Sequence, residues 1–511
     1  MKNIIKNNID KILNKLNINI LNYQISENSK SSFGDYSTNI GLITKKSNEI
    51  ARELEQENMF KRVEIKNGFI NLFIRDSVFI EKINRINNDQ LIDKPAATKK
   101  YNVEFISANP TGPLTIGNGR GGFYGNVLSN ILEFTNNKVI REYYVNDIGN
   151  QINELKQAVE GTGENYKAEY IDKFKMQNAK LKITIDNSKL INTILNDLIK
   201  PTLEKINIHF DKWFYESSLY PKSIDIAIAK LQKLKLIYEK DHALWVKTSK
   251  FGDDKDRVIK KAAGEYTYFM GDIGYLLNKI NRGYDELIFF WGADHHGYIP
   301  RFLAVAKALG IDEKKIKIII CQLVRLTKGN KEFKISKREG NLVTLDDLVK
   351  IVGLDATRYF FLSYDPNTHI DFNLDKAKDK SKKNPVYYIQ YAYVRICRIL
   401  SSQAIAEGSP RLPLGGQVRF SRDDTILDLE LSLIKKLIQF EDMILDISQN
   451  YQVNKLPAYT YTLAREVQLF YEKNRIIGND RENERLAIIH AGKNVLEKCL
   501  DLMGISKPKE M

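Results

Sequence analysis

Cysteine is scarce in this sequence and forms no pattern that could hold a fold together. The 511 residues include three cysteines, Cys321, Cys397 and Cys499, which are widely spaced and lie in apolar surroundings such as IIICQLV and VRICRIL. An odd number of isolated cysteines argues against a disulfide framework and predicts reduced, buried thiols in a cytoplasmic protein. No CxxC pair occurs, and the adjacent histidines His295 and His296 have no companion cluster, so we expect no structural metal site.

Long uninterrupted apolar runs and low-complexity tracts are also missing. The N-terminal segment has apolar residues at helical spacing, interrupted by charges (Ile5, Ile9, Ile12, Leu13 and Leu16). This pattern predicts a helix that faces a core rather than a secretion signal or a membrane span. With 43% hydrophobic and 28% charged residues, the composition is that of an ordinary globular protein. Its length predicts several domains.

The charge balance is strongly basic, with a formal net charge of +14 and a pI near 9.2. Lysine and arginine in excess favour an anionic partner such as nucleic acid, because they displace counterions from a phosphate backbone. Lysine, asparagine and isoleucine are frequent throughout, however, and a biased genome could produce the same excess. Charge alone leaves both interpretations open.

The periodicity changes along the chain and predicts an α/β multidomain protein. Buried parallel strands are expected at YNVEFI, ELIFFW and KIKIIICQLV, which are apolar and β-branched, while apolar residues recur at helical spacing after Pro385. The linker DKPAATKK (93–100) separates a first α+β unit from the predicted sheet. The expected regions are 1–95, 96–345 with a helical insertion at about 165–225, a connecting stem at 346–384, and a helical bundle at 385–511 that contains the surface loop 407–417.

Two segments carry most of the chemical information. SANPTGPLTIGNGRGGFYGN (107–126) places glycines and prolines between a strand and a helix, where free amides can bind a nucleotide, although such a turn can equally serve tight packing. In KEFKISKREGN (331–341), Lys334, Lys337 and Arg338 flank Ser336. A run of like charge is usually a solvated face, but flexible ammonium groups also suit a transition state that places charge on a leaving pyrophosphate.

Together these segments resemble the HIGH and KMSKS signatures of class I aminoacyl-tRNA synthetases, as TIGN (115–118) and KISKR (334–338). Further stretches that resemble bacterial-type arginyl-tRNA synthetases are GDYSTNIG (34–41), NGFINLFI (67–74), REYYVNDIGNQI (141–152), FDKWFYESSLY (210–220), YTYFMGDIGY (266–275) and WGADHHGYIPR (291–301). The resemblance implies a class I Rossmann-like catalytic domain, an N-terminal domain that contacts the tRNA elbow, and a C-terminal all-helical anticodon-binding bundle.

The resemblance also implies roles for individual residues. ATP contacts would come from Gly112, Pro113, Gly117, Asn118, Gly119, Gly292, His296, Ser336 and Lys337. Arginine contacts would come from Glu104, Ser107, Asn109, Tyr268, Asp272 and His295. Without the family pattern, Tyr268 would be interpreted as a core aromatic residue and Asp272 as a surface acid. If their segment is helical, a spacing of four places both side chains on one face.

The chain departs from the family signature at Thr115 and Asn118, which replace both histidines. The Asn118 amide can donate a hydrogen bond at similar reach, whereas the Thr115 hydroxyl is shorter and could need a bridging water. We expect an active site with altered donors, in which Lys334, Lys337, Asn118 and Thr115 stabilise the reacting phosphates.

The implied reaction is the attachment of L-arginine to tRNA(Arg) through an arginyl-adenylate, with ATP and Mg²⁺, by a cytoplasmic monomer with no membrane association. The family typically needs bound tRNA before it activates arginine. Two alternatives remain: a class I synthetase for another amino acid, such as a cysteinyl or glutamyl enzyme, and a non-catalytic RNA-binding paralogue that the lost histidines would permit.

Overall fold

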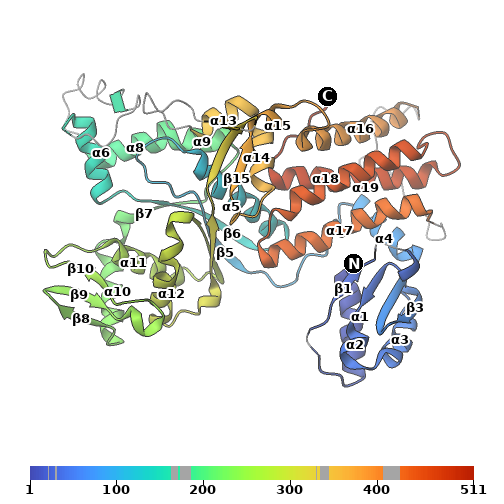
Figure 1. Cartoon of the computed structure of the whole chain (residues 1–511), viewed down its shortest axis with the longest axis horizontal. Coiled ribbons are helices and arrows are strands. Elements are labelled where there is room, and N and C mark those ends of the chain that lie inside the picture. Colours follow the sequence, from blue (N-terminus) through green and yellow to red (C-terminus); the bar gives the residue numbers. More distant parts are fainter. Residues whose placement is uncertain are drawn as a thin grey trace.

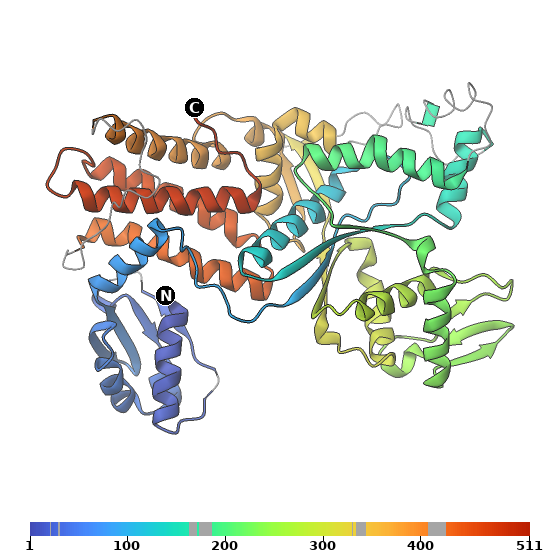
Figure 2. The same ribbon diagram turned by 180° about the vertical axis from the view of Figure 1, so that it is seen from behind.

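The computed structural model describes residues 1–20, 22–28, 31–162, 171–172, 186–329, 331–333, 344–406 and 426–511. In Figure 1 the N-terminal domain lies below the C-terminal helices, and the chain between them forms a central sheet with two inserted parts at its far side. Figure 2 shows the same arrangement from behind. No helix in the described part of the chain is both long enough and apolar enough for a membrane crossing.

The N-terminal domain is a four-stranded antiparallel sheet in the order β1-β2-β4-β3, covered by helices. Its strands are β1 (Ile25–Glu27), β2 (Tyr36–Thr38), β3 (Phe60–Lys66) and β4 (Phe69–Ile74), and its helices are α1 (Lys2–Lys15), α2 (Ile40–Thr44) and α3 (Ser47–Glu55), with a short 3-10 turn, η1 (Ser31–Phe33). The expected stripe on α1 is buried at Ile5, Ile9, Ile12 and Leu13, which confirms a core-facing helix. The predicted α+β unit is therefore confirmed.

The N-terminal domain docks on the C-terminal bundle through ion pairs. Helix α4 (Asp76–Asn87) leads out of the domain, and its Lys82 binds Glu441 at 2.9 Å, with both side chains largely buried. A second pair joins Asp35 of the N-terminal domain to Lys435 at 2.6 Å. Such buried pairs fix orientation well, because their desolvation is repaid only in good geometry.

The central sheet has five parallel strands in the order β12-β11-β5-β6-β7. They are β5 (Lys100–Glu104), β6 (Lys138–Val145), β7 (Lys212–Tyr215), β11 (Glu286–Gly292) and β12 (Ile316–Cys321), and helix α5 (Ile116–Phe134) connects β5 to β6. All three strands expected from apolar runs are present, which confirms those predictions. The order of strands reverses at β5, and ligands of open α/β sheets bind outside the carboxyl ends of the strands at such a switch point.

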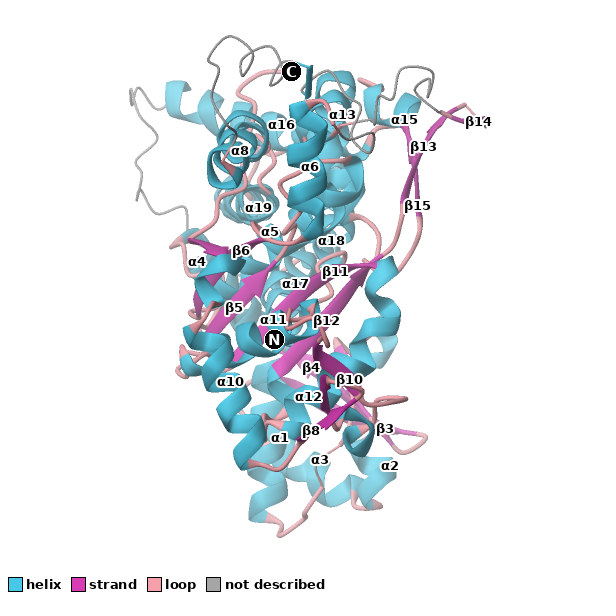
Figure 3. Ribbon diagram, turned by 90° about the vertical axis from the view of Figure 1, so that its left-hand side faces the viewer, coloured by secondary structure: helices cyan, strands magenta, loops and turns pink. Residues whose placement is uncertain are grey.

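The first insertion lies between β6 and β7, above the sheet in Figure 3. It contains α6 (Asn150–Glu160), α8 (Asn187–Ile194), the π-helical turn η2 (Leu195–Ile199) and α9 (Lys200–Lys205). The predicted range, about 165–225, is too long at its C-terminal end, because β7 falls within it and pairs with β6 at the edge of the sheet. Residues 165–170 and 173–185 of that range lie outside the described residues.

A second insertion, which the sequence did not reveal, lies between β7 and β11. Strands β8 (Ile237–Lys240), β9 (Ala243–Val246) and β10 (Arg257–Lys260) form a small antiparallel sheet beside α10 (Lys222–Lys233), α11 (Tyr268–Asn281) and α12 (Ile299–Ala308). The tight turn between β8 and β9 places Asp241 and His242 in the left-handed region, at φ 52° and 55°. Strands of four residues with mixed charges show only weak alternation of apolar and polar residues, so hydrophobic periodicity does not predict this sheet. The 3-10 turns η3 (Glu216–Leu219) and η4 (Thr248–Phe251) belong to the same part of the chain, and η5 (Ala293–Tyr298) follows β11.

The stem consists of a long strand pair and three helices. Strands β13 (Val324–Lys328) and β15 (Ile370–Asn373) are parallel, with β14 (Lys331–Glu332) on the other side of β13, and the helices are α13 (Leu345–Val352), α14 (Leu354–Leu362) and α15 (Leu374–Lys378). The 3-10 turn η6 (Glu313–Lys315) precedes β12. The expected boundary near residue 345 therefore falls between two strands of one sheet.

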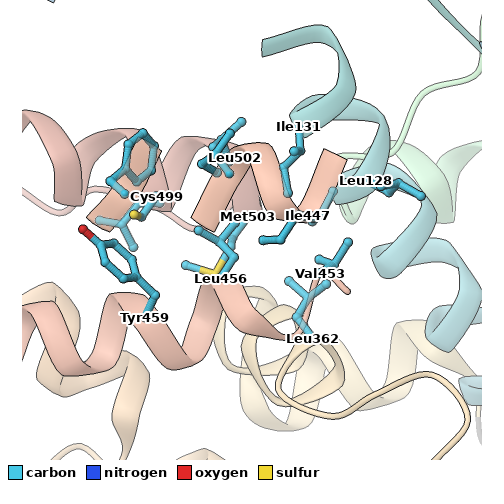
Figure 4. Close-up of a cluster of buried hydrophobic side chains, with 14 of the residues drawn as sticks. Leu128, Ile131, Leu362, Ile447, Val453, Leu456, Tyr459, Cys499, Leu502 and Met503 are labelled. Carbon is cyan, nitrogen blue, oxygen red and sulfur yellow. The ribbon is translucent and has the colours of Figure 1, made fainter. Parts of the chain in front are cut away.

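The C-terminal region is a helical bundle, as predicted, and its described helices are α16 (Pro385–Ala406), α17 (Asp428–Asn450), α18 (Lys455–Lys473) and α19 (Glu482–Met503). The predicted loop 407–417 lies outside the described residues. Figure 4 shows that Leu128 and Ile131 of α5 pack into the same core as Ile447, Leu456 and Met503 of the bundle. The helix that leaves the switch point is thus shared by the sheet and the bundle.

The cysteines follow the prediction in part. Cys321 and Cys499 are buried free thiols, whereas Cys397 is only half-buried. Burial raises the pKa of the Cys321 and Cys499 thiols to about 12.

Candidate active site

The candidate site lies at the carboxyl edge of the central sheet. Glu104 ends β5, Gly292 ends β11, and Glu216 follows directly after β7. Helix α11 contributes Asp272, which confirms that this segment is helical. The residues thus come from four elements far apart in the chain.

Asp272 is half-buried and accepts a hydrogen bond from the Tyr298 hydroxyl. Burial raises the pKa of its carboxyl to about 7, and the nearby charge of Glu104 raises it further, while the Tyr298 hydroxyl and Arg301 act in the opposite direction. A cation placed beside a carboxyl with so high a pKa strongly stabilises its ionised form.

Glu216 is a second such carboxyl, and the sequence reasoning missed it. Its side chain is 4% exposed, and its Oε1 lies 3.1 Å from the position that a Cβ would take on Gly271, next to Asp272. Burial raises the pKa of Glu216 to about 7, with a hydrogen bond from the Tyr144 hydroxyl opposing and the charges of Asp272 and Asp147 reinforcing the rise. The available signal was an acid directly after a short aromatic strand, KWFY, inside a stretch already known to resemble the family.

Glu104 has a different electrostatic environment, because a buried cation neutralises it. Lys279, which is fully buried, lies 2.6 Å from Glu104 Oε2 and 3.4 Å from Glu142, and the Tyr275 hydroxyl donates to the same Glu104 oxygen at 2.7 Å. Arg282 pairs with Glu142 through its two terminal guanidinium nitrogens, Nη1 and Nη2. In the described part of the chain, no ion pair within 4.0 Å involves Asp272 or Glu216. These two carboxyls are the ones left for a cationic ligand.

The other residues expected at the arginine end have contacts of their own. Tyr268 begins α11 and is 55% exposed, so it is not a core aromatic residue, and its hydroxyl lies 3.0 Å from the position of a Cβ on Gly149. Ser107 Oγ accepts a hydrogen bond from the Tyr144 amide at 3.0 Å, and Asn109 is exposed and donates to Gln151.

The loop after β5 has a strained backbone. Ile106 and Ser107 have φ values of 65° and 39°. A β-branched residue in the left-handed region is rare, and such outliers gather at functional sites.

At the other end of the site, Thr115 and Asn118 form the N-terminal cap of α5. The Asn118 Oδ1 atom accepts from the Thr115 amide at 2.8 Å and from the Thr115 hydroxyl at 2.9 Å. Because the oxygen is occupied on the protein side, the Asn118 Nδ2 group faces the other way with both of its hydrogens. Thr115 therefore orients Asn118 rather than offering its own hydroxyl hydrogen to a phosphate.

The glycines of this turn differ in what they do. Gly117 is exposed in the first turn of α5, and Gly112 and Pro113 are half-buried in the loop before it. Gly119 is buried, and a Cβ there would meet Leu345 Cδ1 at 2.9 Å, so its missing side chain serves the packing of α13 on α5. Its contact with ATP stays a prediction.

The predicted lysine loop (KISKR, 334–338) cannot be placed, because Lys334, Ser336, Lys337 and Arg338 lie outside the described residues. The chain is described again at Thr344, which forms a β-bridge with Thr115, and the Leu345 amide donates to the Leu114 carbonyl at 2.9 Å. The chain that follows the lysine loop is thus anchored at the N-terminus of α5, beside the first signature segment.

His295 and His296 follow β11 in η5, and both are exposed. His295 Nε2 lies 3.6 Å from Asp294 and its ring lies 6.1 Å from that of Trp291. Among the residues that the structure describes, no group of three or more histidine, cysteine or acidic side chains is arranged to hold a metal ion.

A parallel sheet with a switch point at β5, a phosphate-binding type of turn before α5 and a separate helical bundle are features of class I aminoacyl-tRNA synthetases. The family model for the class I (R) tRNA synthetase catalytic domain matches residues 82–192 and 169–360, that for the arginyl tRNA synthetase N-terminal domain matches 1–74, and that for the DALR anticodon binding domain matches 389–511. The chain belongs to the arginyl-tRNA synthetase family.

Relatives cover the chain from end to end. The arginine--tRNA ligase of Aquifex aeolicus is 34% identical, with 100% of each chain covered, and that of Mesomycoplasma hyopneumoniae is 38% identical, with 95% of each covered. Among solved structures, the arginyl-tRNA synthetases of Thermus thermophilus and Plasmodium falciparum share the fold at 18% identity, with TM-scores of 0.76 and 0.77, and cover 100% and 99% of this chain and 100% and 98% of their own. The chain is thus an enzyme that attaches arginine to tRNA with ATP, and the alternatives of another specificity or a non-catalytic paralogue are not favoured.

Proposed function

We propose that the arginine substrate binds with its guanidinium between Asp272 and Glu216. The observation that carries this proposal is the pair of desolvated carboxyls, neither of which forms an ion pair within 4.0 Å in the described chain. A planar guanidinium presents five donors in a fixed fork that suits two carboxylates. Glu104, held by Lys279, completes the acidic wall, and Tyr268, Ser107, Asn109 and His295 border the rest of the substrate.

ATP binds at the N-terminus of α5 in this proposal. Gly112, Pro113 and Gly117 leave the backbone accessible, and helix amides together with Asn118 donate to the phosphates. Gly292 and His296 approach from the end of β11, and Ser336, Lys334 and Lys337 from the lysine loop.

The chemistry then follows from position and charge. An oxygen of the arginine carboxylate forms a bond to the α-phosphorus, the bond from that phosphorus to the bridging oxygen breaks, and pyrophosphate leaves with the electron pair. A ribose hydroxyl at the tRNA end next attacks the carbonyl carbon, and AMP leaves as the arginyl ester forms. Donors aimed at the phosphates stabilise the developing charge, and no protein nucleophile is needed.

Mg²⁺ belongs to the ATP in this proposal. Magnesium is commonly bound through substrate phosphates with only one or two carboxylates, which fits a described chain without a multi-carboxylate cluster. Its role is to neutralise phosphate charge. We further propose that the enzyme is a cytoplasmic monomer, in line with its unpaired cysteines.

Exchange of labelled pyrophosphate into ATP tests the assignment of the arginine end. With tRNA(Arg) present, we expect arginine-dependent exchange by the wild-type enzyme. Glu216→Gln keeps the shape but removes the charge, so arginine KM should rise about 100-fold while ATP KM stays within twofold. An unchanged arginine KM would remove Glu216 from the guanidinium site.

A further inference from the structure

Arg120 lies two residues after Asn118 in α5 and is 1% exposed. Its guanidinium donates to three backbone carbonyls of the stem: from Nη1 to Phe361 at 3.1 Å, and from Nη2 to Thr368 at 3.0 Å and to Asp365. Two of its nitrogens thus join the first two turns of α5 to the end of α14 and the turn that follows it.

The three carbonyls share a structural position. Phe361 lies in the last turn of α14, and Asp365 and Thr368 lie in the turn that leads from α14 to β15. The last carbonyls of a helix lack partners within the helix, and a cation there is favourable. Arg120 therefore acts as a cap for α14 that is supplied by α5.

Stability alone does not explain a charged residue at this place. The described hydrogen-bond partners of Arg120 include no carboxylate, because Asp365 contributes its carbonyl oxygen. A buried charge without an opposite charge is costly, and a well-packed apolar side chain would join two helices at lower cost. What the guanidinium adds is direction, because a rigid fork fixes several carbonyls at once.

The stem contacts the start of α5 at a second point. Thr344 is bridged to Thr115, and Leu345 packs against Gly119. The Thr115–Asn118 cap therefore lies between two attachments to the stem, the bridge at its N-terminal side and Arg120 at its C-terminal side. The same stem carries both described ends of the lysine loop, Phe333 and Thr344.

We infer that Arg120 is a positioning residue for adenylate formation, which holds the Thr115–Asn118 cap in register with the stem. This inference rests on the proposed role of Asn118 as a phosphate donor. Arg120 touches no substrate, and its effect reaches the phosphates only through the placement of the Asn118 amide. A shift of α5 along the stem would move that amide away from the α-phosphate.

Arg358 provides a matched control on the same helix pair. It lies in α14, is fully buried, and donates to the carbonyls of Met503 and Ile206 and to Asn126 Oδ1, each at 2.6 Å. Its bond to α5 is made at Asn126, two turns beyond Asn118. Arg358 therefore matches Arg120 in burial, in charge and in donating to backbone carbonyls, but not in proximity to the cap.

The test is a double-mutant cycle on the single-turnover rate of arginyl-adenylate formation, at saturating substrates with tRNA(Arg). Arg120→Lys keeps the charge but loses the fork, and we expect about a tenfold lower rate in the wild-type background but less than a twofold change in the Asn118→Ala background. Arg358→Lys should change the rate by the same factor in both backgrounds. Thermal midpoints of all variants report the structural contribution.

The outcomes distinguish a failure of the positioning role of Arg120 from a failure of the proposed role of Asn118. Equal factors for Arg120→Lys in both backgrounds, or a wild-type rate for Arg120→Lys, would overturn the positioning role. A wild-type rate for Asn118→Ala alone would instead overturn the role of Asn118. If Arg120→Lys does not fold, Arg120→Gln takes its place in the cycle and is judged by the same factors.

Discussion

Under the proposed function, the arginine end and the ATP end of the active site bind their substrates by opposite means. At the arginine end, Asp272 and Glu216 are desolvated acids whose pKa values are raised to about 7, and the buried Lys279 pairs with their neighbour Glu104. At the ATP end, the described side chains, Thr115 and Asn118, are neutral and hold each other. Specificity for a cation requires matched charge, whereas phosphate binding can rely on helix amides and one oriented side chain. The ATP end can therefore lose its signature histidines without losing its geometry.

Removal of charge at the arginine end should have the largest effect. Asp272→Asn keeps the contact with Tyr298, but a guanidinium loses an ionic partner, which costs about 2–5 kcal/mol in buried pairs. We expect kcat/KM for arginine to fall by roughly 10³-fold, measured by aminoacylation of tRNA(Arg). Glu265→Gln, at an exposed acid just before α11, serves as the control and should stay close to wild type.

Loss of the oriented amide should come next. Asn118→Ala removes the donor that faces the phosphates, and loss of one such donor typically lowers kcat about 10²-fold. The fall should appear in kcat for pyrophosphate exchange, with arginine KM within twofold. A variant with the wild-type rate would assign phosphate binding to the backbone amides alone.

The KM for arginine should depend on pH, whereas the KM for ATP should not. With the pocket empty, the pKa of Asp272 and of Glu216 is about 7, so both groups take up protons as the pH falls through 7. Arginine prefers the ionised carboxyls, so its KM should rise about tenfold between pH 8 and pH 6, if one proton must be displaced. ATP KM, measured in the same series, should lack this step. A flat arginine KM would mean that neither carboxyl faces the guanidinium.

The smallest effect concerns the partner of Asn118. Thr115→Val removes the hydroxyl that fixes the Asn118 oxygen and should lower kcat about threefold to tenfold, the usual worth of one hydrogen bond. Thr115→Ser keeps the hydroxyl and should remain within twofold. If the two variants behave alike, the Thr115 hydroxyl plays no part in orientation.

Much of this site could be predicted from the sequence, and the failures have physical reasons. Asp272 and Tyr268 were found because their four-residue spacing and family pattern agree with a helix. Glu216 was missed because its burial depends on α11 and Tyr144, which are distant in sequence. The packing role of Gly119 was missed because glycine in a phosphate-type turn and glycine at a helix contact look alike until Leu345 is seen beside it.

The fold shows the same division. The long apolar strands of the sheet were predicted, since burial on both faces leaves a clear signal. The four-residue strands β7 to β10 were not, because such short strands with mixed residues give a weak alternation signal. The Thr115–Asn118 cap has a partial signal in the sequence. A threonine followed three residues later by a polar side chain at a helix start has the spacing of a capping box.

The measurement that most directly tests the opposed character of the two ends is the discrimination between arginine and citrulline by the wild-type enzyme. Citrulline has nearly the same shape but a neutral ureido group in place of the guanidinium. If Asp272 and Glu216 recognise a cation, kcat/KM for transfer of citrulline to tRNA(Arg) should be at least about 10³-fold lower than for arginine. Transfer of citrulline at a rate within tenfold of arginine would contradict the account.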